Sequence, residues 1–273
     1  MALKDISIGQ YLQGYSFLHR MDPRYKLVLT VAYIVMLFIV SHPLGYLVVV
    51  GFLFAAFLVA RVPFRLLRKS IKPILPIVIF TAVLNLFFIT GSGDPLFSFG
   101  FLHIYLDGVT LAVTMAIRIV CLIAGTSLLT YTTTPIALTD ALEKLLGPLK
   151  KLHFPAHELA MMMTTALRFI PTLVEETDKI MSAQKARGAD MESGGLMQRV
   201  KALIPVLIPL FVSAFRRADE LALAMECRCY RGGEGRTRLK ELKAGYRDLV
   251  ACLIVIACFG AIISINLLLP PLF

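Results

Sequence analysis

The sequence SAQKARGAD at residues 182–190 has a near repeat in AMECRCYRGGEGR at residues 224–236. Each segment ends a long stretch with the spacing of an amphipathic helix, and each places an arginine between two small residues. The two triplets are Ala186-Arg187-Gly188 and Cys227-Arg228-Cys229. The rest of the chain is typical of a membrane anchor that would hold these two helix ends in the cytoplasm.

A shift of 41 residues aligns the two helical stretches. The matched pairs are Arg187 with Arg228, Asp178 with Asp219, Ile180 with Leu221, and Ala183 with Ala224. A repeated element indicates a repeated partner, so the alignment predicts two similar docking sites for related subunits. A planar guanidinium engages a carboxylate through two hydrogen bonds, and small neighbours let a partner backbone approach. The alternative is a solvated cap, since positive charge is favoured at any helix C-terminus.

Composition and charge distribution place the chain in a membrane. Of its 273 residues 58% are hydrophobic, and the mean hydropathy is +0.77, as in integral membrane proteins. The net charge is +10, yet 27 of the 28 lysines and arginines lie in residues 1–26, 61–72 and 144–247. This asymmetry is the positive-inside pattern, which explains the charge without a nucleic-acid partner. Residues 1–20 lack the continuous apolar region of a cleavable signal peptide.

Apolar segments predict an all-α integral membrane protein with about five transmembrane helices. These segments are residues 26–40, 44–60, 71–90, 109–131 and 246–269. With the charge asymmetry they predict a cytoplasmic N-terminus and an external C-terminus. The predicted regions are 1–131 with four spans, 132–245 with long amphipathic helices on the cytoplasmic side, and 246–273 with the final span.

Within residues 132–245 the spacing predicts helices that do not cross the membrane. One follows Pro135, a second runs from residue 156 to 185, and a third from about 199 to 229. The last two begin apolar and end charged. Glycines are expected to stop them: Gly188 and residues 194–195 for the second helix, and residues 232–233 with Gly235 for the third.

The sequence gives little support to a catalytic, metal-binding or nucleotide-binding site. Arg118 is the charged residue of the fourth span and is expected to bind a carboxylate or carbonyl inside the protein. His153 and His157 have the i, i+4 spacing of a helical metal site, but Pro155 lies between them and no zinc-protease pattern follows. The cysteines of 227–229 are interpreted as small residues in a tight contact. No phosphate-binding loop or nucleophile–base pair is recognisable, so we expect no catalytic residue, metal or bound cofactor.

Several longer motifs extend over nearly the whole chain. They are GYSFLHRMDPR at 14–24, LTDALE at 138–143, ALRFIPTL at 166–173, QKARGAD at 184–190 and MECRCYRGG at 225–233. In these motifs the chain resembles the transmembrane T component of energy-coupling factor transporters, which are ATP-driven importers of vitamins and metal ions in prokaryotes. That family more usually has alanine at the position of Cys227, which is also small.

The resemblance implies a non-catalytic scaffold in the plasma membrane of a prokaryote. Two cytoplasmic ATP-binding cassette ATPases, which use ATP and Mg²⁺, would each receive one arginine motif in a groove. The implied docking residues are Ala186, Arg187, Gly188, Cys227, Arg228 and Cys229. A separate membrane-embedded S component would bind the substrate and contact apolar faces of the two long helices. The residues expected at that contact are Leu159, Met162, Met163, Ala166, Leu203, Leu207 and Leu210; the alternative is that these faces pack against each other.

Other functions stay open at this level. One is a conventional ABC-type permease subunit that lines its own substrate pathway, although Arg118 and Asn85 are nearly the only suitable polar groups in the spans. A second is the T component of a dedicated cobalt or nickel importer. A membrane-bound enzyme is a third, for which no catalytic constellation is recognisable.

Overall fold

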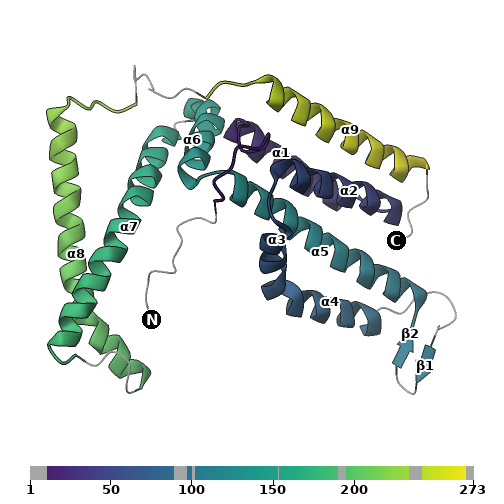
Figure 1. The fold of residues 1–273 in the computed structure, drawn as a ribbon, viewed down its shortest axis with the longest axis horizontal. Helices are drawn as coiled ribbons and strands as arrows, with labels where there is room; N and C mark the ends of the chain where they lie inside the picture. Colours follow the sequence, from purple (N-terminus) through teal and green to yellow (C-terminus); the bar gives the residue numbers. More distant parts are fainter. Residues whose placement is uncertain are drawn as a thin grey trace. The chain divides into compact units, whose positions relative to one another are not determined.

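The computed structural model describes residues 11–88, 97–99, 102–152, 154–189, 195–233 and 242–268. Helices dominate the chain, as Figure 1 shows. The elements are α1 (Pro23–Ile39), α2 (Pro43–Ala60), α3 (Phe64–Ile71), η2 (Lys72–Ile74), α4 (Leu75–Phe88), β1 (Phe97–Phe99), β2 (Leu102–Ile104), α5 (Leu106–Thr132), α6 (Pro135–Leu146), η3 (Gly147–Leu152), α7 (Ala156–Ala186), α8 (Leu196–Cys227) and α9 (Tyr246–Leu268). The prediction of an all-α membrane protein is confirmed, and the short antiparallel hairpin β1–β2 is an addition that the sequence did not reveal.

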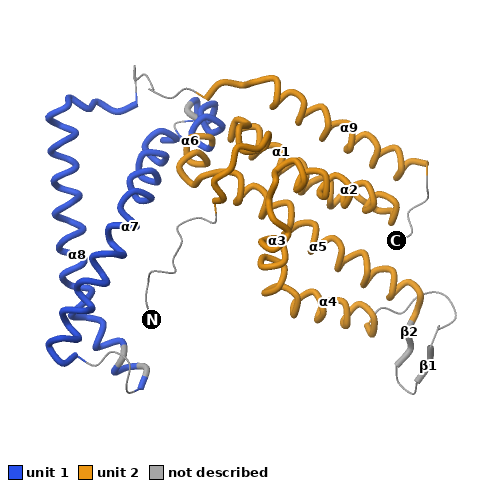
Figure 2. Tube along the Cα trace, in the orientation of Figure 1, with its two compact units in different colours: residues 1–8, 142–240 blue, residues 9–141, 241–273 orange. Residues whose placement is uncertain are grey.

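The chain divides into two compact units, coloured separately in Figure 2. One unit holds the described residues of 9–141 and 241–273, which include α1 to α5 and α9. The other holds the described residues of 142–240, which include the end of α6, α7 and α8. The final helix therefore belongs to the same compact unit as the first five helices, although more than 100 residues separate α5 from α9 in the sequence.

Within the described residues, four helices are long and apolar enough to cross a membrane. They are Pro43–Ala60, Phe64–Phe88, Leu106–Thr132 and Tyr246–Leu268. Helix α1 corresponds to the first predicted span, but it has only 17 residues. At 1.5 Å per residue it reaches about 26 Å, less than the roughly 30 Å of a hydrocarbon core. A membrane-crossing role for α1 stays a prediction.

The basic stretch after Arg61, which is expected on the cytoplasmic side, is mostly helical. It forms the helix α3, which continues through η2 into α4. Figure 1 shows α3 and α4 meeting at an angle. The change of direction falls at Pro73 and Pro76, because proline removes a backbone donor and clashes with the preceding turn.

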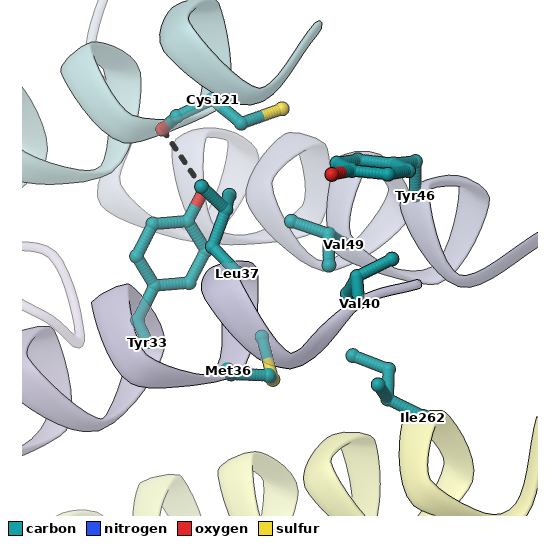
Figure 3. Packing of buried hydrophobic residues seen from close by; sticks show 8 residues of the cluster. All are labelled: Tyr33, Met36, Leu37, Val40, Tyr46, Val49, Cys121 and Ile262. Carbon is teal, nitrogen blue, oxygen red and sulfur yellow. Dashed lines mark hydrogen bonds between the residues drawn. The ribbon is translucent and has the colours of Figure 1, made fainter. Parts of the chain in front are cut away.

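A buried apolar cluster joins α1, α2, α5 and α9 (Figure 3). Its members are Tyr33, Met36, Leu37, Val40, Tyr46, Val49, Cys121 and Ile262. The Tyr33 hydroxyl donates a hydrogen bond of 2.9 Å to the Cys121 carbonyl, which satisfies it inside the apolar core. The Tyr33 ring also lies so close to Gly125 that a β-carbon there would overlap the ring. Glycine at this position thus permits close approach of α1 and α5.

Arg118 of α5 has partners inside the protein, as its position in an apolar span predicted. Its Nε donates to the Tyr46 hydroxyl over 2.8 Å, and its Nη2 donates to the Val40 carbonyl over 3.3 Å. The carbonyl partner was anticipated by the sequence analysis, whereas the tyrosine was not. Arg118 therefore ties α5 to α2 and to the end of α1.

A polar cluster at the start of α1 joins that helix to α5 and α9. Asp22 caps α1 and pairs with Arg24 over 2.7 Å, while its own backbone N–H donates to Asp248 Oδ1 over 2.9 Å. The buried Lys26 Nζ donates to the Thr132 carbonyl at the end of α5 over 2.9 Å. Buried charges are stable only when they are paired or hydrogen-bonded, and these contacts meet that need. The MDPR end of the motif at 14–24 and the following Lys26 thus join α1 to α9 and α5, respectively.

Candidate functional site

The C-terminus of α7 is closed by a specific set of backbone hydrogen bonds. Arg187 caps the helix with φ −83° and ψ 4°, and Gly188 follows with φ +83°. The Ala189 N–H donates to the Gln184 carbonyl, and the Gly188 N–H donates to the Lys185 carbonyl, both over 3.0 Å. This pattern is the Schellman motif, in which the residue after the cap takes a left-handed conformation.

The C-terminus of α8 has the same closure. Arg228 caps the helix with φ −93° and ψ 13°, and Cys229 follows with φ +54°. The Tyr230 N–H donates to the Met225 carbonyl over 3.0 Å, and the Cys229 N–H donates to the Glu226 carbonyl over 2.9 Å. The two arginine triplets therefore share one backbone shape, although one has glycine and the other cysteine at the left-handed position.

The glycines expected to stop α8 have another place in the structure. The helix ends at Cys227, five residues before Gly232. Gly232 has φ +90°, which glycine adopts readily, so it supports a turn in the segment after the helix. The expectation that 232–233 stops α8 was therefore wrong, because the Schellman closure at Cys229 already ends the helix. Gly188 was correctly assigned for α7.

Both arginine side chains are accessible. All six residues of the two triplets are exposed: Ala186, Arg187, Gly188, Cys227, Arg228 and Cys229. Among the residues that the structure describes, neither arginine side chain makes a hydrogen bond or an ion pair. Each guanidinium therefore keeps its planar set of donors available for an external carboxylate.

An ion pair joins the two long helices α7 and α8. Arg217 Nη2 lies 2.7 Å from Glu176 Oε2, and these two positions are related by the same shift of 41 residues as the arginine triplets. Arg187 follows Glu176 by 11 residues, and Arg228 follows Arg217 by 11 residues.

The helical segments from the ion pair to the two arginines are called here the Arg187 arm (residues 176–187) and the Arg228 arm (residues 217–228). Each has a length of about 16 Å at 1.5 Å per residue. The two arms therefore carry the same exposed triplet, with the same backbone closure, 11 residues after the ion pair in each helix. This equality is a property of the folded chain and could not be obtained from the repeat alone.

The residues expected at an S component lie on α7 and α8 with different degrees of exposure. Met162, Met163, Ala166, Leu203 and Leu207 are exposed, whereas Leu159 and Leu210 are half-buried. A further row of exposed apolar residues on α8 repeats at helical spacing and lies mostly within the apolar face expected at 202–215. It consists of Val200, Ile204, Ile208, Phe211 and Phe215, with Phe215 exposed to 68%. The opposite face carries Val206, which is buried.

The other residues singled out in the sequence do not assemble a metal site in the described part of the chain. His157 Nδ1 lies 3.0 Å from Glu143 Oε1, and His153 lies outside the described residues. The described residues contain no group of three or more histidine, cysteine, aspartate or glutamate side chains that could hold a metal ion. Cys227 and Cys229 are exposed thiols.

A cavity of about 200 Å³ lies between α1, α2, α5 and α9. Its lining is mostly apolar, and Lys26 is its charged member. The Lys26 ammonium already donates to the carbonyls of Thr132 and His19, over 2.9 and 3.4 Å. A cavity whose charged group is already occupied by backbone carbonyls gives little support to the permease alternative, which requires polar groups that face the substrate.

Comparison with known proteins gives one consistent family. Residues 14–239 match the family described as cobalt transport protein, CbiQ. The chain is 57% identical over 260 residues to the energy-coupling factor transporter transmembrane protein EcfT of Clostridium kluyveri, covering 94% of this chain and 96% of the relative. It is 52% identical over 257 residues to the protein of that name from Acidaminococcus fermentans, covering 94% and 95%. It is 49% identical over 252 residues to that of Bacillus subtilis, covering 92% and 95%. Because these similarities extend over nearly the full length of both partners, the chain belongs to the family of energy-coupling factor transporter transmembrane proteins.

Proposed function

We propose that this chain couples two cytoplasmic ATPases to a membrane-embedded substrate-binding S component and itself binds no substrate, metal or cofactor. The observation that carries the proposal is the pair of matched arms, which end in identical backbone closures with exposed arginines. Two equal docking ends on one chain fit two related partners better than one partner.

Each arm would dock through its arginine. A guanidinium without an internal partner can form a two-point contact with a carboxylate in a partner groove, and the neighbouring small residues leave room for the walls of that groove. The Glu176–Arg217 ion pair joins the first residues of the two arms. A displacement of one arm by its ATPase is therefore passed to the other, and through α7 and α8 to the apolar faces.

Those apolar faces are the proposed contact with the S component. Met162 and Met163 of α7 are 57% and 45% exposed, and Leu203 and Leu207 of α8 are 42% and 46% exposed. Methionine is flexible and polarisable, so it adapts to partners of different shape. Large exposed apolar stripes mark surfaces that bind another protein or the membrane. The stripe Val200–Phe215 extends this surface along α8.

ATP hydrolysis, with its Mg²⁺, would belong to the partner ATPases, since this sequence has no phosphate-binding loop. The arms then have to be cytoplasmic, with the N-terminus inside and the C-terminus outside. Single cysteines at His42 and Lys243, in a chain without its own cysteines, test this orientation. An impermeant thiol reagent applied outside should label the first and spare the second; the reverse pattern contradicts the proposal.

The docking test uses the arginines themselves. Arg187→Ala and Arg228→Ala should each reduce transport strongly and release part of the ATPase, because truncation of one partner of a buried pair costs about 2–5 kcal/mol. The double substitution should release both ATPases and leave the chain in the membrane, since two-point attachment is lost. Lysine should restore only part of the binding, because an ammonium lacks the planar two-point contact.

Arg216→Ala and Lys201→Ala are the matched controls, because both residues are exposed on α8 and lie outside the two arms. The measurement is the amount of ATPase that co-purifies with the tagged, detergent-solubilised chain. If the double variant keeps its ATPases as well as the controls do, the arginines are solvated caps and the docking proposal fails. Co-purification of ATPases without any small hydrophobic partner would favour the permease alternative.

A further inference from the structure

A chain of hydrogen bonds connects the tip of the Arg228 arm to the start of α7. Glu143 Oε1 of α6 lies 3.0 Å from His157 Nδ1 of α7. On the other side of the ring, His157 Nε2 lies 3.3 Å from the Tyr230 hydroxyl, which follows α8. The imidazole thus bridges a carboxylate and a phenol that are 87 residues apart in the sequence.

The hydrogen-bond roles follow from the chemistry of the three groups. A carboxylate only accepts, so the proton on Nδ1 is donated to Glu143. Nε2 of the neutral ring then accepts the Tyr230 hydroxyl proton. The side chains of His157 and Glu143 are only 25% and 17% exposed, so water competes weakly for these contacts. A carboxylate that holds one ring nitrogen fixes the orientation of the other, as it does for histidines at metal sites.

Close packing at Gly233 supports the same contact independently. A β-carbon at Gly233 would lie 2.5 Å from His157 Cδ2 and 2.7 Å from Cγ, which real side chains do not tolerate. The backbone of Gly233 therefore rests directly on the imidazole ring. Residues 230–233 form a strap that runs from the end of α8 to the first turn of α7.

The two arms differ at this point. Tyr230 is the second residue after the helix cap of the Arg228 arm, where its N–H closes the Schellman motif. Under the shift of 41 residues its equivalent on the Arg187 arm is Ala189, whose methyl group cannot form a hydrogen bond. The two arms thus differ at Tyr230, the side chain that contacts His157.

We propose that Glu143, His157 and Tyr230 position the Arg228 arm for docking. The two arginine sites then differ, because the Arg187 arm has no equivalent of the Tyr230 side chain. This inference rests on the proposed docking function. The Arg228 arm is held at its first residue by the Glu176–Arg217 ion pair and beyond its last residue by the strap, and a preorganised site loses less entropy when a partner binds. His157, which resembled half of a metal site in the sequence, is a positioning residue.

The test separates the two arms genetically. Tyr230→Phe, which removes only the hydroxyl, is placed in an Arg187→Ala background, where docking depends on Arg228, and in an Arg228→Ala background, where it depends on Arg187. ATPase binding to the full chain in detergent is titrated in both. We expect Tyr230→Phe to weaken binding about five-fold in the first background, as the loss of one hydrogen bond does, and to leave the second unchanged.

Gly233→Ala provides a second route to the same result, because the added methyl pushes the strap off the ring without removing a polar group. Tyr15→Phe, at an exposed tyrosine, is the matched control. Equal weakening in both backgrounds would show a general structural role and overturn the inference, as would no weakening in either. Failure of the docking function itself would be seen separately, as retention of ATPases by the Arg187→Ala, Arg228→Ala double variant.

Discussion

The Glu176–Arg217 ion pair offers the sharpest test of how the arms work together. Glu176→Arg alone places two arginines at this contact between α7 and α8, and Arg217→Glu alone places two glutamates there. The double exchange, with arginine at 176 and glutamate at 217, restores an ion pair of reversed direction. Since neither residue belongs to a docking triplet, these variants separate coupling between the arms from docking at their tips.

The structure sets the size of the effect. The charged atoms are 2.7 Å apart, and the arginine and glutamate side chains are 31% and 23% exposed. Two unit charges 4 Å apart interact by about 4 kcal/mol at an effective dielectric constant of about 20. Water at a partly exposed site screens most of this, so loss of the pair should cost about 1 kcal/mol. Charge reversal replaces attraction by repulsion of similar size, so it should cost about 2 kcal/mol, twice the loss of the pair.

The assay compares ATPase retention with transport in reconstituted complexes. Each single reversal should retain both ATPases, because both docking arginines remain, while less substrate is moved per ATP hydrolysed. The double exchange should recover most of the loss. Arg216→Glu, an adjacent exposed position, controls for the change in net charge. Unchanged coupling in the single reversals, or no recovery in the exchange, would refute the idea that this ion pair joins the arms.

Three further predictions concern stability. Gly125→Ala should lower the melting temperature, because its β-carbon overlaps the buried Tyr33 ring and overpacking costs about 1–3 kcal/mol; Gly51→Ala, which meets no atom within 4 Å, is the control. Cys229→Gly should stabilise the end of α8 by roughly 0.5–1 kcal/mol, seen as slower amide exchange in its last turn, because glycine adopts a left-handed conformation without strain. Burial lowers the pKa of His19 below its usual 6.5, so the unfolded chain binds more protons there and stability falls as the pH drops through 6.5 towards the folded pKa. His19→Gln should therefore flatten the dependence of melting temperature on pH in this range, and an unchanged slope would contradict the assignment.

Local patterns in the sequence predicted the elements well. The two long helices were placed at 156–185 and about 199–229, and the structure has them at Ala156–Ala186 and Leu196–Cys227. Periodicity, composition and helix-stop residues are properties of neighbouring residues, so no tertiary contact was needed to find them. The same is true of the arginine repeat, which is a similarity between two stretches of sequence.

The misses have separate physical causes, one local in the chain and one tertiary. Cys229 takes the left-handed position because the Schellman hydrogen bonds outweigh a modest strain, whereas residue preference pointed to the glycines that follow. The tyrosine partner of Arg118 depends on how α2 packs against α5.

The sequence by itself determined that this is an α-helical membrane protein of the energy-coupling factor family with two arginine-ended helices, because hydropathy, helical spacing and motif similarity are all local in the chain. Only the tertiary structure decided that Glu176 meets Arg217, so that the arms are of equal length, and that Tyr230 meets His157, so that their tips differ. Both contacts depend on how α7 packs against α8 and on the path of residues 230–233 after α8. A crossing is set by the packing of whole helix surfaces, and that packing is not encoded in the period of either helix alone.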